Sequence, residues 1–183
     1  MSNLEGESFA ETQARLLVEQ YKEYLFIDSS GKSYTLMRKR KVVSNMGGCT
    51  LEIGQTIEIF EVCGEKSWIV KVAKLDKFYD FITLDCDVDI RSHEPDLYIP
   101  TPQQSFYQGR ISGGRPFFER GRIITTDLMK MINIGSTINE SAGAEGCGLF
   151  YDMGSDLLGI CVGVSTDSSG EHTNRFIPIG FCI

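Results

Sequence analysis

Two stretches in the C-terminal third, AGAEGCGLF at residues 142–150 and DLLGICVG at residues 156–163, decide the fold and the candidate site. In the first, Cys147 lies between two glycines ahead of an apolar segment, and the second is an apolar strand pattern. Glycines let the backbone turn sharply, so the pattern favours a nucleophilic cysteine on a tight loop, although a buried cysteine in a glycine-rich turn gives the same pattern. The nucleophile hypothesis predicts an oxyanion hole built from the backbone N–H groups of Glu145, Gly146 and Cys147.

Outward from these stretches, the chain has the pattern of one helix followed by many short strands. Apolar residues recur every three or four positions over residues 9–25, which predicts an amphipathic helix. After it, the apolar period changes to two, or to short apolar runs bounded by turn residues, as is typical of strands. Strands are predicted at 24–27, 33–37, 41–44, 55–62, 68–74 and 81–86 in a first group, and at 106–112, 116–124, 148–151, 157–163 and 174–179 in a second.

Three prolines separate the two groups of strands. Pro95, Pro100 and Pro102 lie among acidic and polar residues and indicate a linker. A helix followed by two successive groups of short strands predicts a mainly β fold of two packed antiparallel barrels or a sandwich. The predicted organisation is an N-terminal helix and lead-in at 1–26, a first barrel at 27–92, a linker at 93–104 and a second barrel at 105–183.

Charge and composition exclude several function classes. The net charge of −7 argues against a general affinity for nucleic acid or anionic membranes, because phosphate binding depends on Lys and Arg density, and the one basic cluster is at residues 38–41. No apolar run approaches the ~18 residues of a membrane span, and residues 1–6 lack the regions of a signal peptide, so we expect a cytoplasmic protein. The six cysteines are then free thiols, and without a C-x₂-C pair or a phosphate-binding glycine loop the sequence predicts no metal and no cofactor.

Three segments carry a resemblance to a known family. The loop around Cys147 resembles the Gly-Asp-Ser-Gly-Gly loop of chymotrypsin-like proteases and, more closely, the Gly-x-Cys-Gly-Gly loop of viral cysteine proteases of that fold. FYDFITL at 78–84 resembles the strand that carries the acidic triad member, and DIRSHEP at 89–95 is similar to the interdomain linker of picornains, the polyprotein-processing proteases of picornaviruses. The resemblance implies a chymotrypsin-like double antiparallel β-barrel with an N-terminal amphipathic helix, and it places Cys147 and Asp80 at catalytic positions.

The chain departs from this resemblance at the catalytic base. In the protease superfamily, a histidine one loop after the strand predicted at 41–44 takes the cysteine proton. Here Gly48, or Gly47 if the alignment shifts by one residue, stands at that position. The two histidines of the chain, His93 and His172, match non-catalytic positions in the linker and in the loop before the last strand. Without a base to orient, Asp80 is expected to be vestigial.

Two further departures concern ligands. Picornains recognise a glutamine side chain through the histidine of a Gly-x-His-x-Gly segment, where this chain has Cys161. The resemblance therefore places substrate binding at Cys161, Val162 and Gly163 without implying glutamine selectivity, because a thiol is a poor hydrogen-bond donor. The basic RNA-binding sequence of the family's linker is replaced by CDVDI at residues 86–90, so we do not expect RNA binding.

Two functions of different class follow. The one that we favour is a pseudoprotease, in which catalysis has lapsed and an extended peptide or protein partner binds in the inter-barrel cleft as a strand beside residues 157–164. The alternative is an active cysteine endopeptidase that processes a viral polyprotein through Cys147, with His172 moved to the thiol or with a buried Lys74 or Lys77 as the base. A structural module without a binding cleft is the third possibility, and the sequence carries no signal for an oligomeric state.

Overall fold

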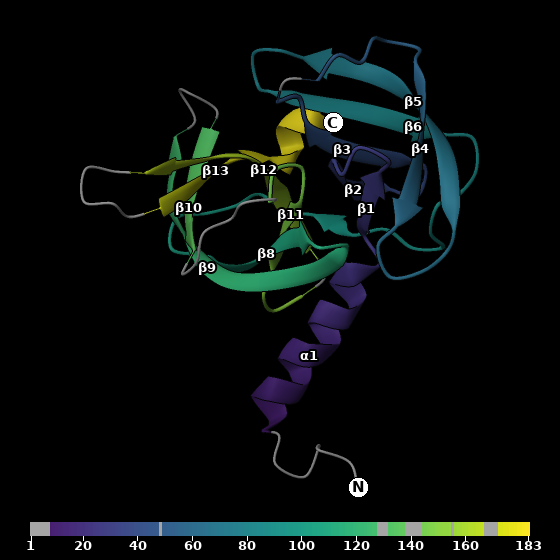
Figure 1. Ribbon diagram of the computed structural model, residues 1–183. Helices are drawn as coiled ribbons and strands as arrows, with labels where there is room; N and C mark the ends of the chain where they lie inside the picture. The colour runs from purple at the N-terminus through teal and green to yellow at the C-terminus, as the bar shows by residue number, and fades with distance from the viewer. Residues whose placement is uncertain (1–7, 48, 128–131, 138–143, 155, 167–171) are drawn as a thin grey trace, which may run out of the picture.

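The first element of the described residues is a helix that contacts the rest of the molecule mainly at its last turn. The computed structural model describes residues 8–47, 49–127, 132–137, 144–154, 156–166 and 172–183. Helix α1 (Phe9–Lys22) is capped by Ser8, whose side chain accepts a hydrogen bond from the N–H of Glu11 at 3.1 Å. Tyr21 is its one buried residue, so most of the helix extends away from the strands (Figure 1). The helix ends at Lys22 and not at residue 25 as predicted, because Leu25 is already the first residue of strand β1.

Six antiparallel strands form the first barrel. They are β1 (Leu25–Asp28), β2 (Ser33–Arg38), β3 (Lys41–Asn45), β4 (Thr56–Glu61), β5 (Ser67–Asp76) and β6 (Phe81–Cys86). Their order around the closed barrel is β1-β2-β3-β6-β5-β4, so β4 returns to pair with β1. The sequence predicted all six strands, because each is a short apolar run bounded by turn residues.

The second barrel contains six strands in a ring and one short strand beside it. The ring members are β8 (Ser105–Ser112), β9 (Arg115–Asp127), β10 (Ile132–Thr137), β11 (Gly148–Tyr151), β12 (Asp156–Thr166) and β13 (His172–Pro178), followed by the 3₁₀ turn η2 (Ile179–Cys182). The sheet order β11-β8-β9-β10-β13-β12 closes through an additional β11–β12 pairing. The mainly β, double-barrel fold class is thereby confirmed, although β10 and the two-residue β7 (Asp96–Leu97) were not predicted.

The two barrels share a continuous core. One cluster of buried side chains runs from Phe26 and Leu36 in the first barrel to Phe150 and Ile160 in the second, and Cys147 belongs to it. A smaller cluster fills the rest of the second barrel around Phe106, Leu158 and Phe176. In the part of the chain that the structure describes, no helix combines the length and the apolar character needed to cross a bilayer.

The segment between the barrels is attached at both of its ends. On the first-barrel side, the N–H of Ile90 donates to the carbonyl of Lys39 at 2.7 Å, and the N–H of Lys39 donates to a carboxylate oxygen of Glu94 at 2.8 Å. On the second-barrel side, β7 pairs in parallel with the start of β12, with Leu97 opposite Leu157. The linker residues are therefore hydrogen-bonded to both barrels.

Candidate functional site

Three loops from distant parts of the sequence meet between the barrels. The loop after β3 and the β5–β6 turn are joined by a hydrogen bond from the N–H of Met46 to the carbonyl of Asp80 at 3.0 Å. The loop before β11 reaches the first barrel through its Gly146 carbonyl, which accepts a hydrogen bond from the Thr35 hydroxyl at 2.8 Å. The predicted positions of acid, base and nucleophile thus belong to loops that lie on the same side of the shared core.

Asp80 is held in an unusual backbone conformation. It lies in the β5–β6 turn with φ of 62°, in the left-handed region that side chains other than Asn and Asp rarely adopt. Its Oδ1 accepts a hydrogen bond from the backbone N–H of Gly47 at 3.1 Å. The carboxylate predicted to orient a base therefore binds the backbone of the loop in which that base would lie.

The base position itself, Gly48, lies outside the described residues, as does the side chain of His172. His172 was predicted to lie in the loop before the last strand, but it is the first residue of β13, and its backbone pairs with that of Thr166. His93 is exposed in the linker, where its Nε2 lies 3.7 Å from a carboxylate oxygen of Glu23. Both lysines considered as replacement bases, Lys74 and Lys77, are exposed.

The loop that carries Cys147 is a tight turn. The N–H of Cys147 donates to the carbonyl of Ala144 at 2.9 Å, and Gly146 has φ of 87°. A Cβ at position 146 would lie 2.3 Å from the carbonyl oxygen of Ser33, so only glycine fits between the turn and β2. The sequence correctly predicted a tight glycine turn at this place.

Cys147 is completely buried. Its exposed fraction is 0%, and burial raises the pKa of its thiol to about 12, with the nearby Glu145 carboxylate adding to the effect. Hydrogen bonding to Ser33 acts in the opposite direction but does not offset the burial. In this arrangement the Cys147 thiol is protonated and is packed in the core.

Two of the three N–H groups expected to form an oxyanion hole, those of Gly146 and Cys147, already have partners inside the protein. That of Cys147 donates to Ala144, as described above, and that of Gly146 donates to the carbonyl of Cys161 at 2.9 Å. An oxyanion hole needs donors that point at the place where negative charge develops on the substrate. A substrate oxygen would have to displace both internal hydrogen bonds.

The predicted substrate-binding segment differs in exposure along its length. Cys161 is buried, its thiol lies 3.7 Å from the carbonyl of Gly163, and burial raises the pKa of the thiol to about 12. Val162 is 6% exposed, and Gly163 is partly exposed. Of the three residues, Gly163 is thus the most accessible to a ligand.

One edge of β12 is only partly covered. Over Leu157–Ile160 that edge pairs with β11, and the backbone groups of Cys161 bond to the Cys147 loop. Among the described strands, none pairs with this edge over residues 162–166, whereas the opposite edge pairs with β13 throughout. Among the described strands, the section of the predicted peptide-binding edge without a partner is therefore the C-terminal part of β12, here termed the open edge.

A partly buried lysine lies in this region and was missed by the sequence analysis. Lys32, at the end of the β1–β2 turn, donates a hydrogen bond from its Nζ to Oδ1 of the buried Asn45 at 3.0 Å. Burial lowers the pKa of Lys32, while Cys49, Asp28, Asp80 and Glu145 favour its charged form in that order. No local pattern distinguishes this lysine from a solvated turn residue, because apart from Asp28 these neighbours come from three other segments.

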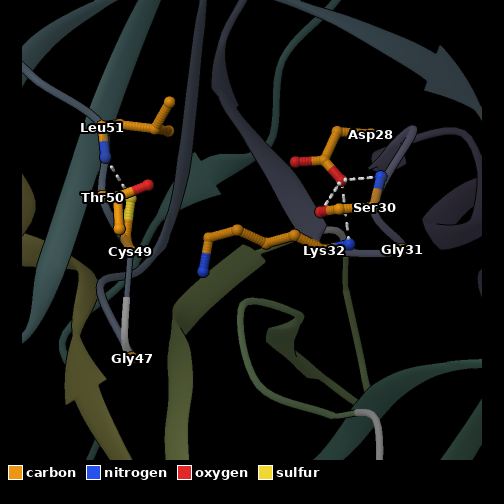
Figure 2. Close-up of a pocket in the computed structure, with 8 residues that line it drawn as sticks. All are labelled: Asp28, Ser30, Gly31, Lys32, Gly47, Cys49, Thr50 and Leu51. Carbon is orange, nitrogen blue, oxygen red and sulfur yellow. Dashed lines mark hydrogen bonds between the residues drawn. The ribbon is translucent and has the colours of Figure 1, made fainter.

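Lys32 also lines a cavity of about 500 Å³. Figure 2 shows that its side chain extends from the β1–β2 turn toward the segment that carries Gly47 and Cys49. The other lining residues are Asp28, Ser30, Gly31, Thr50 and Leu51. The cavity is a first-barrel feature, on the side of the molecule where the three loops meet.

The basic cluster at residues 38–41 is largely neutralised. Arg40 pairs with Asp89 at 2.8 Å, Lys41 with Asp85 at 3.1 Å, and Arg38 lies 3.8 Å from Glu94. These exposed pairs are weak in free energy, but they place carboxylates among the cations. The cluster is therefore a poor match for a phosphate backbone.

Comparison with known proteins identifies the fold. No protein-family model and no curated protein matches the sequence. Solved structures do match: the protease domain of MamO from Magnetospirillum magneticum superimposes with a TM-score of 0.70 at 14% identity, over 88% of this chain and 95% of that one. The Rv3671c protease of M. tuberculosis, in its inactive form, gives 0.68 at 12% identity over 90% of this chain and 88% of that one.

A serine endoprotease from Yersinia pestis gives a TM-score of 0.70 at 14% identity. The match covers 92% of this chain and 63% of the endoprotease, so the chain spans less than two thirds of that protein. These similarities show a chymotrypsin-like fold and confirm the fold class predicted from the sequence.

Proposed function

We propose that the protein is a catalytically lapsed relative of chymotrypsin-like cysteine proteases of the picornain type, and that it binds an extended peptide or protein partner along β12. The observation that carries the proposal is the state of Cys147. A nucleophilic cysteine acts as a thiolate that its substrate can reach, whereas this thiol is 0% exposed and has a pKa of about 12.

The surroundings of Cys147 support the same proposal. Asp80 binds the backbone of Gly47 rather than an imidazole, and the N–H groups of Gly146 and Cys147 are used within the protein. Loss of the base from a nucleophile–base unit typically lowers the rate by roughly 10⁶. In the described part of the chain, peptide cleavage therefore lacks an ionised nucleophile and a base beside it, and two of the three predicted oxyanion-hole donors are occupied.

Peptide binding is supported by the open part of β12. An extended peptide can add to such an edge through main-chain hydrogen bonds, while pockets beside the edge select its side chains. Backbone groups of residues 162–166 on the side opposite β13 have no partner strand among the described strands. We propose a peptide rather than RNA, because the net charge is −7 and the basic cluster is paired with carboxylates.

The test uses a phage-displayed library of linear peptides against the full chain. We expect at least one peptide to bind saturably and to be recovered uncut, and Cys147→Ala to bind it with unchanged affinity. Failure of every peptide to bind would overturn the binding function. Cleavage by the wild-type chain that is lost in Cys147→Ala would instead establish the alternative, an active endopeptidase.

Hydrogen exchange then locates the bound peptide. A peptide added to the open edge protects backbone amides within residues 162–166, while exchange in the remote strand β4 stays unchanged. Protection confined to the first barrel would contradict the proposed edge without contradicting peptide binding itself.

A further inference from the structure

We propose that Lys32 and Cys49 form a thiol–amine site that captures acyl groups from small thioesters, with Cys49 as the entry thiol and Lys32 as the final acceptor. The proposal goes beyond the peptide-binding function and concerns different side chains. It starts from the cavity of about 500 Å³ in the first barrel, which Lys32 and Cys49 line together. That volume lies within the range of small-molecule sites, roughly 300–1,000 Å³.

Cys49 differs from the other described cysteines in its surroundings. Cys86, Cys147, Cys161 and Cys182 are buried, whereas Cys49 is partly exposed and lines the cavity. Its sulfur accepts a hydrogen bond from the N–H of Leu51 at 3.3 Å, which fixes the direction of the side chain. Cys49 thus combines accessibility, a defined orientation and an adjoining volume in which a ligand can lie.

The amine lies opposite this thiol. Figure 2 shows the Lys32 side chain crossing toward the segment that carries Cys49, and Cys49 is the strongest of the ionisable groups that favour the charged amine. The flexible four-carbon stem of a lysine allows its Nζ to leave Asn45 and swing within the cavity. Burial lowers the pKa of Lys32, so a larger share of the amine is neutral and nucleophilic than at an exposed lysine.

The first step is a thiol exchange. The Cys49 sulfur attacks the carbonyl carbon of the donor thioester, and the bond between that carbon and the donor sulfur breaks. Cys49 attacks as its thiolate and the donor also leaves as a thiolate, which takes up the proton that Cys49 released. Asp28 lines the cavity, and Asp80 and Glu145 lie near enough to Lys32 to favour its charged form, so this group of carboxylates favours a neutral donor over an anionic one.

The second step moves the acyl group to nitrogen. The neutral Nζ of Lys32 attacks the carbonyl of the Cys49 thioester, a C–N bond forms as the C–S bond breaks, and the proton lost by nitrogen returns to the Cys49 sulfur. No oxidant or reductant takes part. Because the thioester is held in the same cavity as the amine, the transfer is intramolecular and faster than acylation of an exposed lysine from solution.

The experiment uses the full chain and the neutral acetyl thioester of N-acetylcysteamine, followed by peptide mapping. We expect Lys32 to be acetylated about tenfold or more faster than the exposed Lys39 and Lys71. Cys49→Ser should reduce the Lys32 rate to that of the exposed lysines, and Lys32→Arg should leave a stable, hydroxylamine-sensitive thioester on Cys49.

Cys63 supplies the matched control. It is exposed and has Lys22 among its charged neighbours, but it does not line the cavity, so Cys63→Ser should leave Lys32 acetylation unchanged. Lys32 acetylation that persists in Cys49→Ser, or that never exceeds that of Lys39, would overturn the proposal. Exposure of the buried Cys147 in Cys49→Ser would indicate that this variant is misfolded. In that case, formation of the Cys49 thioester in Lys32→Arg decides the question. Peptide binding is measured separately, so either function can fail without the other.

Discussion

The backbone N–H of Gly47 donates to Oδ1 of Asp80 at 3.1 Å, and Asp80 presents this oxygen from a left-handed conformation with φ of 62°. The acid of a protease triad would bind a histidine, whereas this one binds the chain itself. The bond links the loop after β3 to the β5–β6 turn, so the carboxylate stabilises the end of the first barrel.

Substitution of Asp80 should therefore affect stability. Asp80→Ala removes the acceptor and places an unfavourable side chain in the left-handed region, for an expected cost of about 1–2 kcal/mol. Asp80→Asn keeps an acceptor oxygen and tolerates this φ, so it should cost about 0.5 kcal/mol. Urea unfolding of the two variants measures the difference, and equal losses would show that the Gly47 bond contributes nothing.

Cys147 should resist alkylation. Burial raises the pKa of the Cys147 thiol far above neutral pH, so the thiol is protonated at pH 7, and the sulfur is also shielded from reagents. Iodoacetamide at pH 5–9, followed by peptide mapping, should modify Cys63 and Cys49 while Cys147 reacts only after unfolding by urea. Rapid modification of Cys147 in the folded chain would favour the endopeptidase instead.

Alanine substitutions at Gly31 and Gly146 separate two costs of adding a side chain to a glycine with positive φ, namely backbone strain and steric overlap. Gly31→Ala, with φ of 89° and nothing within 4 Å of the new Cβ, should cost only the backbone strain of about 1 kcal/mol. Gly146→Ala has a similar φ of 87°, but its Cβ would lie 2.3 Å from the Ser33 carbonyl oxygen and 2.6 Å from the Ser44 hydroxyl. We expect a loss of about 3 kcal/mol or more in urea unfolding, because the second barrel's loop must move off the first barrel. Similar losses in the two variants would contradict this close packing.

Tyr21 should make stability sensitive to alkaline pH. Burial, together with the nearby Asp152 and Asp156, raises the pKa of the Tyr21 phenol above its ordinary 10.0. The unfolded chain then loses this proton first, so the stability contribution is complete below pH 10 and declines as the pH rises above it.

Tyr21→Phe is the matched variant for that prediction. It keeps the stacking on Phe150, whose ring centroid is 4.5 Å away, but loses the hydroxyl that donates to the carbonyls of Tyr151 and Gly154. We expect a loss of about 1 kcal/mol at pH 7 and a shallower decline above pH 10 in urea unfolding. An unchanged slope would show that other groups, such as Tyr34, determine the alkaline limit.

The fold was predictable from the sequence because its signals are local. The strands of the first barrel are short apolar runs between turns, and the loop at Gly146 has glycines where a sharp turn needs them. β10 (Ile132–Thr137) was missed because Gly135 interrupts its pattern, and β7 because two residues between prolines carry no periodicity.

The state of the candidate site was less predictable, because it depends on packing between segments far apart in the sequence. Ser33 and Thr35 of β2 contact the Cys147 loop from more than a hundred positions away, and the thiol itself is packed in the core that the two barrels share. The environment of Lys32 likewise comes from residues of both barrels. A motif of glycines and cysteine indicates a turn, but it does not indicate whether the sulfur faces solvent or the core.

The linker has a consequence for how the molecule responds to any ligand. Ile90 and Glu94 bond to the turn between β2 and β3, and the next residues, Asp96–Leu97, form β7 on β12. These bonds restrain hinge motion at residues 90–97, and the shared core resists shear between the barrels. The relative position of the two barrels is thus fixed before a ligand arrives, so ligand binding costs little free energy of reorganisation. We expect the free and ligand-bound forms to superimpose as rigid bodies.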